Sequence, residues 1–366
     1  MSIPPSEPSP PRRGVGPDGV AGDLARHLAE EAVGAPRETS ASGADRLVRP
    51  VLIVAVLGAV LYAGFAFFTD ARGVGQAIAT FPPWILWVAM GLSFSNYVVR
   101  FVRWRSYCRR LGIELEDGTS FLIHLSGLAL TVSPGKMGEA FKSILVRRVR
   151  GTPIAVSAPI VLAERFTDLA AFLVLIAIGA LAGEGGSAWI AWSTLGLCVA
   201  LFSFVSSRAL QNLGLHVLRR IGPLARLVPK VEEGLASTRV LLAPSQILVP
   251  TLIATVGWSL ECFGFQLVAG AFVEGGVPFL FAAYTFALAA VAGAVAFVFP
   301  GGLGITEASM GALLRRRYEL AGLGTTAAGA SAVSAVILIR VATLWFAVVV
   351  GLVATFLFRR RFGGLT

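Results

Sequence analysis

The sequence predicts an all-α polytopic membrane protein, and its composition, its long apolar runs and the placement of its arginines carry this prediction. Of the 366 residues, 55% are hydrophobic and 14% are charged, and the mean hydropathy is +0.76. Two or three soluble domains would fit the length, but the apolar runs approach the ~20 residues that a membrane-spanning helix needs. The net charge of +10 comes largely from arginines that flank these runs, which favours membrane topology over nucleic-acid binding.

Eight hydrophobic segments follow a polar tail. The tail, residues 1–45, is rich in Pro, Gly and Ser, which is typical of a disordered segment, and the membrane domain is expected over residues 46–361. The segments cover residues 51–69, 83–102, 119–133, 154–182, 188–206, 246–273, 279–299 and 327–357. The linker at residues 208–245 alternates aliphatic residues with Arg and is expected to form amphipathic helices on the inner leaflet.

The arginines also predict the orientation of the segments. Arg clusters follow the second, third and fifth segments, so these ends are expected in the cytoplasm, and the connections that contain Asp70, Glu184 and Glu274 are expected outside. Arg clusters therefore stand on both sides of the third segment. Its 15 residues would reach only about 22 Å as a helix, short of a hydrocarbon core of roughly 30 Å. We expect a re-entrant hairpin that enters and leaves by the cytoplasm and folds within residues 133–142.

The seventh segment is predicted to be a second hairpin, entering from outside. The arginine triples at residues 315–317 and 359–361 have one segment between them, so one triple violates the charge rule whichever orientation is chosen. A repeated Pro-Gly pattern decides for the hairpin. The chain would then have six spans, two hairpins and both termini in the cytoplasm of a plasma-membrane protein. Segments two to four and six to eight would form an inverted repeat, an arrangement that many transporters use.

Two stretches, SPGKMGEAFK at 133–142 and FPGGLGITEAS at 299–309, predict where the site lies. In both, Pro-Gly ends an apolar run and a carboxylate follows; proline removes a backbone donor, and glycine permits close approach of the backbone. A broken helix in hydrocarbon leaves unpaired N–H and C=O groups, so it persists only inside protein or beside a wet cavity. The helix N-terminus after each break would present free N–H groups to an anion.

Charged residues inside the apolar runs complete the candidate site. Glu164 and Asp168 share a helix face, with Arg165 alongside, and Arg340 is the counterpart in the second half. Ionisable residues within a membrane are functional candidates by default. The alternative is a structural role, in which Arg165 bonds the carbonyls freed by the break, or Glu139, and so locks the hairpin. The predicted lipid-binding and transport residues are Pro134, Gly135, Lys136, Gly138, Glu139, Lys142, Glu164, Arg165, Asp168, Pro300, Gly301, Gly302, Gly304, Glu307 and Arg340.

Other charged residues allow more than one interpretation. Glu261 is a lone carboxylate in the sixth segment, and a helix-packing hydrogen bond is at least as good an explanation as a functional role. Arg100, Arg103 and Arg105 are predicted to extend to the inner headgroups rather than to line a path. Lys136 and Lys142 flank the first break and could either reach a phosphate or anchor the hairpin at the interface.

Three stretches together resemble a known family. SPGKMGEAFKSILVRR, VLAERFTDL and FPGGLGITEASMGALL are similar to the flippase-like membrane region of lysylphosphatidylglycerol synthases, which also occurs in stand-alone membrane proteins and some membrane glycosyltransferases. The resemblance covers roughly residues 46–360. It implies a lipid-handling domain that in the synthases moves an aminoacylated phospholipid between leaflets. We expect no synthase activity here, because neither the tail nor the residues after 357 are expected to form a soluble transferase domain.

The sequence therefore predicts a lipid translocase rather than an enzyme. Its substrate would be an anionic or phosphate-bearing lipid: a phospholipid, an aminoacylated lipid or a polyprenyl-linked lipid. No metal or cofactor is expected, because the three cysteines and three histidines have no ligand spacing and the GKM at 135–137 is not a P-loop. The carboxylates Glu139, Glu307 and Asp168 would balance the cations or carry a coupling proton.

Two alternatives to translocation stay open. One is a membrane-embedded lipid-modifying transferase that uses Glu139 or Asp168 as its base. The other is a non-transporting accessory subunit of a cell-envelope synthesis complex, whose partners would be envelope-synthesis enzymes as well as membrane lipids.

Overall fold

The computed structural model describes residues 71–132, 141–184, 244–295 and 302–363, together with scattered positions between 192 and 241. Within these residues the regular elements are all helices, which confirms the predicted all-α class. The tail at 1–45, the segment at 51–69 and both Pro-Gly breaks lie outside the described residues. Most of the segment at 188–206 and of the linker at 208–245 lies outside them as well.

Six expected segments have helical counterparts. They are α4 (Pro83–Arg110), α5 (Asp117–Ser126) with the 3-10 turn η1 (Gly127–Leu130), α7 (Ile154–Leu181), α11 (Pro244–Gly270), α12 (Phe279–Val295), and α14 (Thr325–Arg340), which continues through the π-helical turn η5 (Val341–Trp345) into α15 (Phe346–Phe362). Three further helices are α3 (Ala71–Ala79), α6 (Phe141–Arg150) and α13 (Ile305–Leu320). Helices α6 and α13 follow the two Pro-Gly breaks, where helix N-termini are expected.

The ends of the helices follow from local sequence. Helix α4 has Pro83 in its first turn, where a backbone N–H would have no partner within the helix. Two arginines in its last turn interact favourably with the negative end of the helix dipole. Gly112 then turns the chain with a φ of 67°. Among the described residues, three helical stretches are long and apolar enough to cross a membrane: Pro83–Arg110, Gln246–Gly270 and Thr325–Phe362. Helix α7 has 28 residues but carries three charged residues along its middle.

Helices α5 and α6 form one hairpin, and helices α12 and α13 form a second. Each hairpin begins and ends at the same side of the bundle. At the first, Arg150 at the end of α6 donates from Nε to the carbonyl of Glu114, just before α5. At the second, the guanidinium of Arg317 near the end of α13 lies 5.4 Å from the ring centroid of Phe281 near the start of α12. Re-entry of these hairpins into a membrane stays a prediction, because these contacts establish only how the helices pair.

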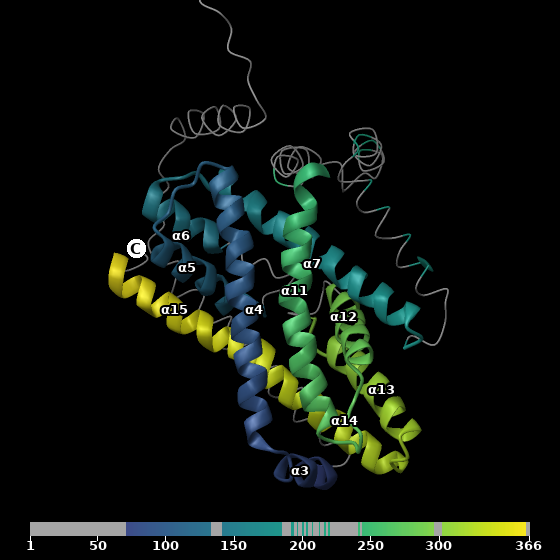
Figure 1. The fold of residues 1–366 in the computed structure, drawn as a ribbon. Coiled ribbons are helices and arrows are strands. Elements are labelled where there is room, and N and C mark those ends of the chain that lie inside the picture. Colours follow the sequence, from purple (N-terminus) through teal and green to yellow (C-terminus); the bar gives the residue numbers. More distant parts are fainter. Residues whose placement is uncertain are drawn as a thin grey trace, which may run out of the picture.

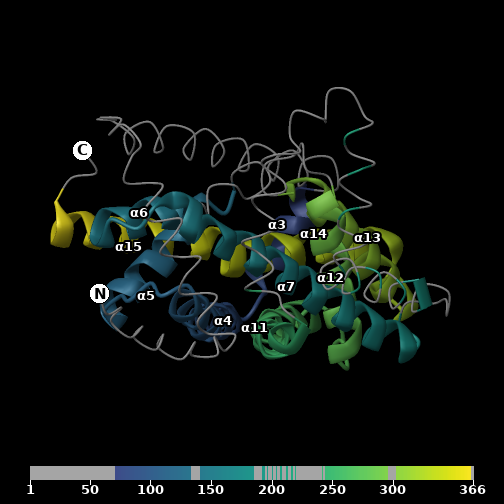
Figure 2. The same cartoon turned by 90° about the horizontal axis from the view of Figure 1, so that it is seen from above.

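Helices α4 and α11 lie side by side, and in the view from above they lie along one edge of the described helices (Figures 1 and 2). They run antiparallel, because Asn96 on α4 meets Glu261 on α11 whereas Ala89, two turns earlier, meets Gly264, one turn later. Beside this pair, α12 packs on α7, and α5 and η1 pack on α15.

Glycines make both of these hairpin contacts close. A Cβ on Gly179 of α7 would lie 2.7 Å from Tyr284 Cβ, and one on Gly351 of α15 would lie 2.1 Å from the backbone nitrogen of Ala129. Each hairpin therefore packs against a long helix of the other half. This reciprocity agrees with the predicted inverted repeat, which itself stays a prediction.

Candidate functional site

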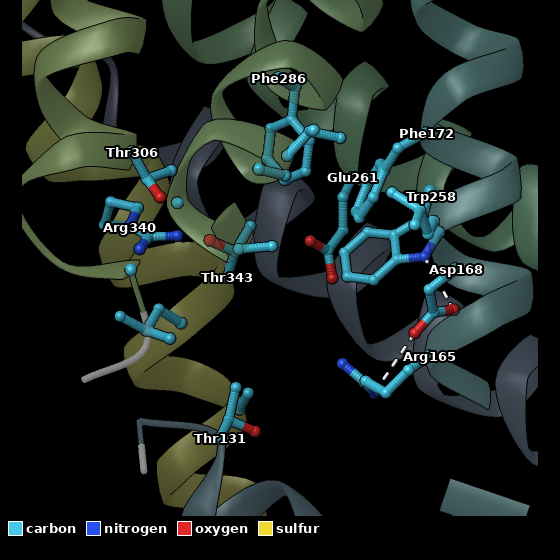
Figure 3. Close-up of a pocket in the computed structure, with 18 of the residues that line it drawn as sticks. Thr131, Arg165, Asp168, Phe172, Trp258, Glu261, Phe286, Thr306, Arg340 and Thr343 are labelled. Atoms are coloured by element: carbon cyan, nitrogen blue, oxygen red, sulfur yellow. Dashed lines mark hydrogen bonds and ion pairs between the residues drawn. The ribbon is translucent and has the colours of Figure 1, made fainter. Parts of the chain in front are cut away.

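A cavity of about 290 Å³ lies between the first half of the described chain (α4 to α7) and the second half (α11 to α15). Its wall combines residues of α4, α7 and α11 with residues of both hairpins and of the α14–η5–α15 helix (Figure 3). Three aromatic side chains, Phe172, Trp258 and Phe286, form one part of this wall. The charged residues that line it are Arg100, Arg165, Asp168, Glu261 and Arg340. A mainly apolar wall with a few converging polar groups is typical of a ligand site.

Asp168 is the centre of the charged network on one side of the cavity. Its carboxylate oxygens lie 2.8 Å from Arg103 Nη1, 3.3 Å from Arg165 Nη2 and 3.4 Å from Arg100 Nη2. The indole Nε1 of Trp258 donates a further hydrogen bond of 3.1 Å (Figure 3). Burying a carboxylate is costly unless it is paired and hydrogen-bonded, and here three guanidiniums and one N–H meet that requirement.

The prediction that Arg100 and Arg103 extend to the headgroups is wrong. Arg100 lines the cavity, and Arg103 is fully buried, with Nη1 2.9 Å from the Thr167 hydroxyl as well as 2.8 Å from Asp168. An arginine reaches for the interface when no partner is available at depth, but α7 supplies a carboxylate beside α4. Arg105 differs: it is partly exposed and pairs with Asp117 at 2.6 Å.

A second buried ion pair joins α6 to α7. Lys142 Nζ donates a hydrogen bond to Glu164 Oε2, and Nζ also lies 4.7 Å from the ring centroid of Trp104. Lys142 is 3% exposed and Glu164 is fully buried, so the interpretation of Lys142 as an interfacial anchor is wrong. Neither residue lines the cavity. The pair instead ties the short helix after the first break to the long helix that follows.

The second half contains an ion pair of reversed polarity. Glu307 on α13 accepts a bond of 2.6 Å from Arg340 Nε on α14, so here the short helix supplies the anion and the long helix the cation. The other oxygen of Glu307 accepts a bond of 2.6 Å from the backbone N–H of Gly304. Gly304 has a φ of 90°, a conformation that glycine adopts readily. Glu307 therefore caps the N-terminus of α13, which sequence reasoning had assigned to an anionic ligand.

Backbone geometry explains Gly302, another predicted site residue. It has a φ of 71°, and a Cβ built on it would lie 2.9 Å from the backbone of Gly293 on α12. Two glycines thus let α12 and the start of α13 approach each other beside the cavity, which both residues line.

Both interpretations of Glu261 agree with the geometry. Asn96 Nδ2 donates to Glu261 Oε1 at 2.6 Å, which is the predicted helix-packing bond between α4 and α11. The same carboxylate lines the cavity. The adjacent residue of α4, Tyr97, donates a 3.2 Å bond from its hydroxyl to the carbonyl of Thr343, inside the π-helical turn that follows Arg340.

Not every predicted site residue can be placed. Those in the two breaks lie outside the described residues, and their roles stay predictions: Pro134, Gly135, Lys136, Gly138, Glu139, Pro300 and Gly301. Of the predicted residues that the structure describes, Arg165, Asp168, Gly302 and Arg340 line one cavity. Arg100 and Trp258 also line it, and sequence reasoning had not assigned them to the site.

Comparison with known families gives one match. The family model described as the lysylphosphatidylglycerol synthase TM region matches residues 51–351, a range that holds every residue lining the cavity. No curated protein matches the chain.

Proposed function

The chain belongs to the lysylphosphatidylglycerol synthase TM region family, and from that premise we propose that it moves an anionic or phosphate-bearing lipid headgroup between the leaflets of a membrane. The family and the apolar helices support a membrane protein tied to lipids. The translocation and the choice of headgroup are the proposal.

One observation supports this function most strongly. Guanidinium groups from three helices, Arg100 of α4, Arg165 of α7 and Arg340 of α14, line a single cavity between the halves. A guanidinium presents a rigid fork of N–H donors that matches the oxygens of a phosphate. The same cavity has an apolar wall, against which the glycerol and the first methylenes of a lipid could pack. The position between two halves is also where transporters with repeats hold their substrates.

The bonding of Asp168 favours transport over a role for this carboxylate in chemistry. A general base needs an accessible lone pair, but Asp168 already accepts bonds from three arginines and from Trp258. A transferase that uses Asp168 as its base would first have to dismantle that network. The accessory-subunit alternative has no supporting observation among the described residues, and we propose transport in its place.

The capping of α13 narrows the proposed headgroup site. Because Glu307 already bonds the backbone N–H of Gly304, we assign the headgroup to the arginine side chains rather than to the N-terminus of α13. Glu307 then acts on the site by holding Arg340 in place.

Reconstitution tests this proposal. The purified chain, in proteoliposomes without nucleotide, is expected to speed the transbilayer movement of a fluorescent anionic phospholipid. Arg340→Lys is expected to lose most of that rate, because an ammonium cannot reproduce the two-pronged contact of a guanidinium. Arg315→Lys is the matched control: Arg315 is exposed on α13 and pairs only with Glu319 among the described residues, so the rate should stay unchanged. Equal rates for wild type and Arg340→Lys would remove Arg340 from the headgroup site.

A further inference from the structure

One face of α4 carries a continuous stripe of polar residues, which we call the α4 polar stripe. It consists of Ser93, Asn96, Arg100, Arg103, Tyr107 and Arg110. Successive members are three or four residues apart, so they lie on one face of the helix. The first five members are buried and Arg110 is half-buried. The stripe passes the cavity, where Asn96 bonds Glu261 and Arg100 pairs with Asp168, and continues to the last residue of the helix.

Most members of the stripe retain buried polar atoms that have no hydrogen-bond partner within the part of the chain that the structure describes. These atoms are Ser93 Oγ, Asn96 Oδ1, Arg103 Nε and Nη2, and Arg110 Nη1. Facing them on α7, Glu164 Oε1 is also without a partner there. A buried polar atom without a hydrogen-bond partner destabilises a fold, so a run of such atoms along one helix face needs an explanation.

These atoms form one connected region rather than scattered defects. Arg103 bonds the hydroxyl of Thr167 on α7. Tyr107, one turn further along α4, lies within hydrogen-bonding reach of the same hydroxyl. Glu164 in turn bonds Lys142 of α6. Residues of α6 and α7 therefore lie beside the half of the stripe that is nearer Arg110. The groups comprise both donors and acceptors, which is what bridging water molecules require, since each typically makes two to four hydrogen bonds.

The opposite part of the same helix face is apolar. One and two turns before Ser93, this face carries Ala89 and Ile85, which are 1% and 8% exposed. Both belong to the main hydrophobic core, with Phe81 beyond them. From the cavity, the polar residues continue to Arg110 in one direction, whereas in the other direction they end at Ser93, one turn before Tyr97.

We propose that the α4 polar stripe, with Glu164 and Thr167, lines a water passage that connects the cavity to the Arg110 end of α4 and to that end alone. Positive charge at this end of the helix is expected in the cytoplasm, so the cavity would be hydrated from the cytoplasmic side in the state that the structure describes. The apolar segment around Ala89 would be the seal toward the outside. The passage does not rest on the proposed lipid transport, because it follows from polar atoms that lie outside the cavity wall.

Radiolytic hydroxyl-radical labelling of the full chain in lipid nanodiscs, after millisecond mixing with ¹⁸O-water, tests this passage. Radicals formed from water modify the tyrosines that water touches. Tyr318 is the matched control: it is as buried as Tyr107, but it lies in the main hydrophobic core, where its hydroxyl bonds the carbonyl of Ala269 at 2.6 Å. We expect Tyr107 to be modified about tenfold faster than Tyr318, with incorporation of ¹⁸O, because its hydroxyl contacts exchangeable water.

Three results would overturn the proposal. Tyr107 modified as slowly as Tyr318 would mean that the stripe is dry. Tyr107 modified with ¹⁶O only would mean isolated internal water and no passage. Label at Trp258 in the cavity without label at Tyr107 would mean that water reaches the cavity by another path.

Discussion

Replacing Glu307 by glutamine tests whether the cap on α13 and the ion pair with Arg340 hold the second hairpin together. The change keeps the size of the side chain but removes the charge, so Arg340 loses a partner at 2.6 Å and the N–H of Gly304 loses a charge-assisted bond of 2.6 Å. Breaking a buried pair by removing one member costs about 3–5 kcal/mol, because the other charge stays buried. Both side chains of this pair are 10% exposed or less.

Glu319→Gln on the same helix provides the matched control. Glu319 pairs with Arg315 at 2.9 Å, but both side chains are more than one third exposed, and an exposed pair four residues apart contributes only about 0.3–0.5 kcal/mol. Equilibrium unfolding in mixed SDS–dodecylmaltoside micelles measures both losses. Glu307→Gln should lower the free energy of unfolding by about 3 kcal/mol more than Glu319→Gln does. If the two variants agree within about 0.5 kcal/mol, the buried pair does not hold α13 to α14.

Two further predictions concern the first hairpin and the orientation. The double variant Lys142→Met, Glu164→Gln should lose much less stability in the same unfolding assay than the two single variants together, since each single change strands a buried charge; additive losses would show that the pair does not interact. In a variant without native cysteines, cysteines at Glu274 and Arg316 should react with an impermeant thiol reagent added outside intact cells, and one at Arg109 should not. Protection of Arg316→Cys would mean that the second hairpin does not open outward.

The helices were predictable because an apolar run of sufficient length leaves few alternatives in a membrane. The structure extends the segment at 83–102 to Arg110 and joins the segment at 327–357 into one helix of 38 residues. The π-helical turn after Arg340 within this helix had no signal in the sequence that we used. Helices α6 and α13 follow the two Pro-Gly stretches, as these stretches indicated, whereas the breaks themselves stay a prediction.

The partner of each charge was harder to predict than its importance. Asp168 was predicted as a site residue, but its arginines Arg100 and Arg103 come from a helix more than 60 residues earlier. Asn96 and Glu261, which bond at 2.6 Å, are 165 residues apart. Sequence position near a helix end suggested that the arginines of α4 reach the interface. The three-and-four spacing from Ser93 to Arg110 was the available signal for a buried polar face, and it outweighs position.

The contacts of the predicted charged residues divide them into two groups. Arg165, Asp168 and Arg340 line the cavity, whereas Lys142, Glu164 and Glu307 pair beside it and hold the short helices of the hairpins. In the sequence, all six are charged residues in apolar surroundings, so pattern alone could not divide them.

Headgroup selectivity in transport tests the central claim most directly. Two fluorescent lipids with the same acyl chains, one with a phosphate-bearing anionic headgroup and one with a neutral sugar headgroup, are placed in the outer leaflet of nucleotide-free proteoliposomes. The purified chain should speed the transbilayer movement of the phosphate-bearing lipid well above that of the neutral one, because the arginines of the cavity bind phosphate oxygens. If the neutral lipid crosses as fast as the anionic one, or if neither crosses faster than in protein-free liposomes, a phosphate-centred translocation site between the two halves is contradicted.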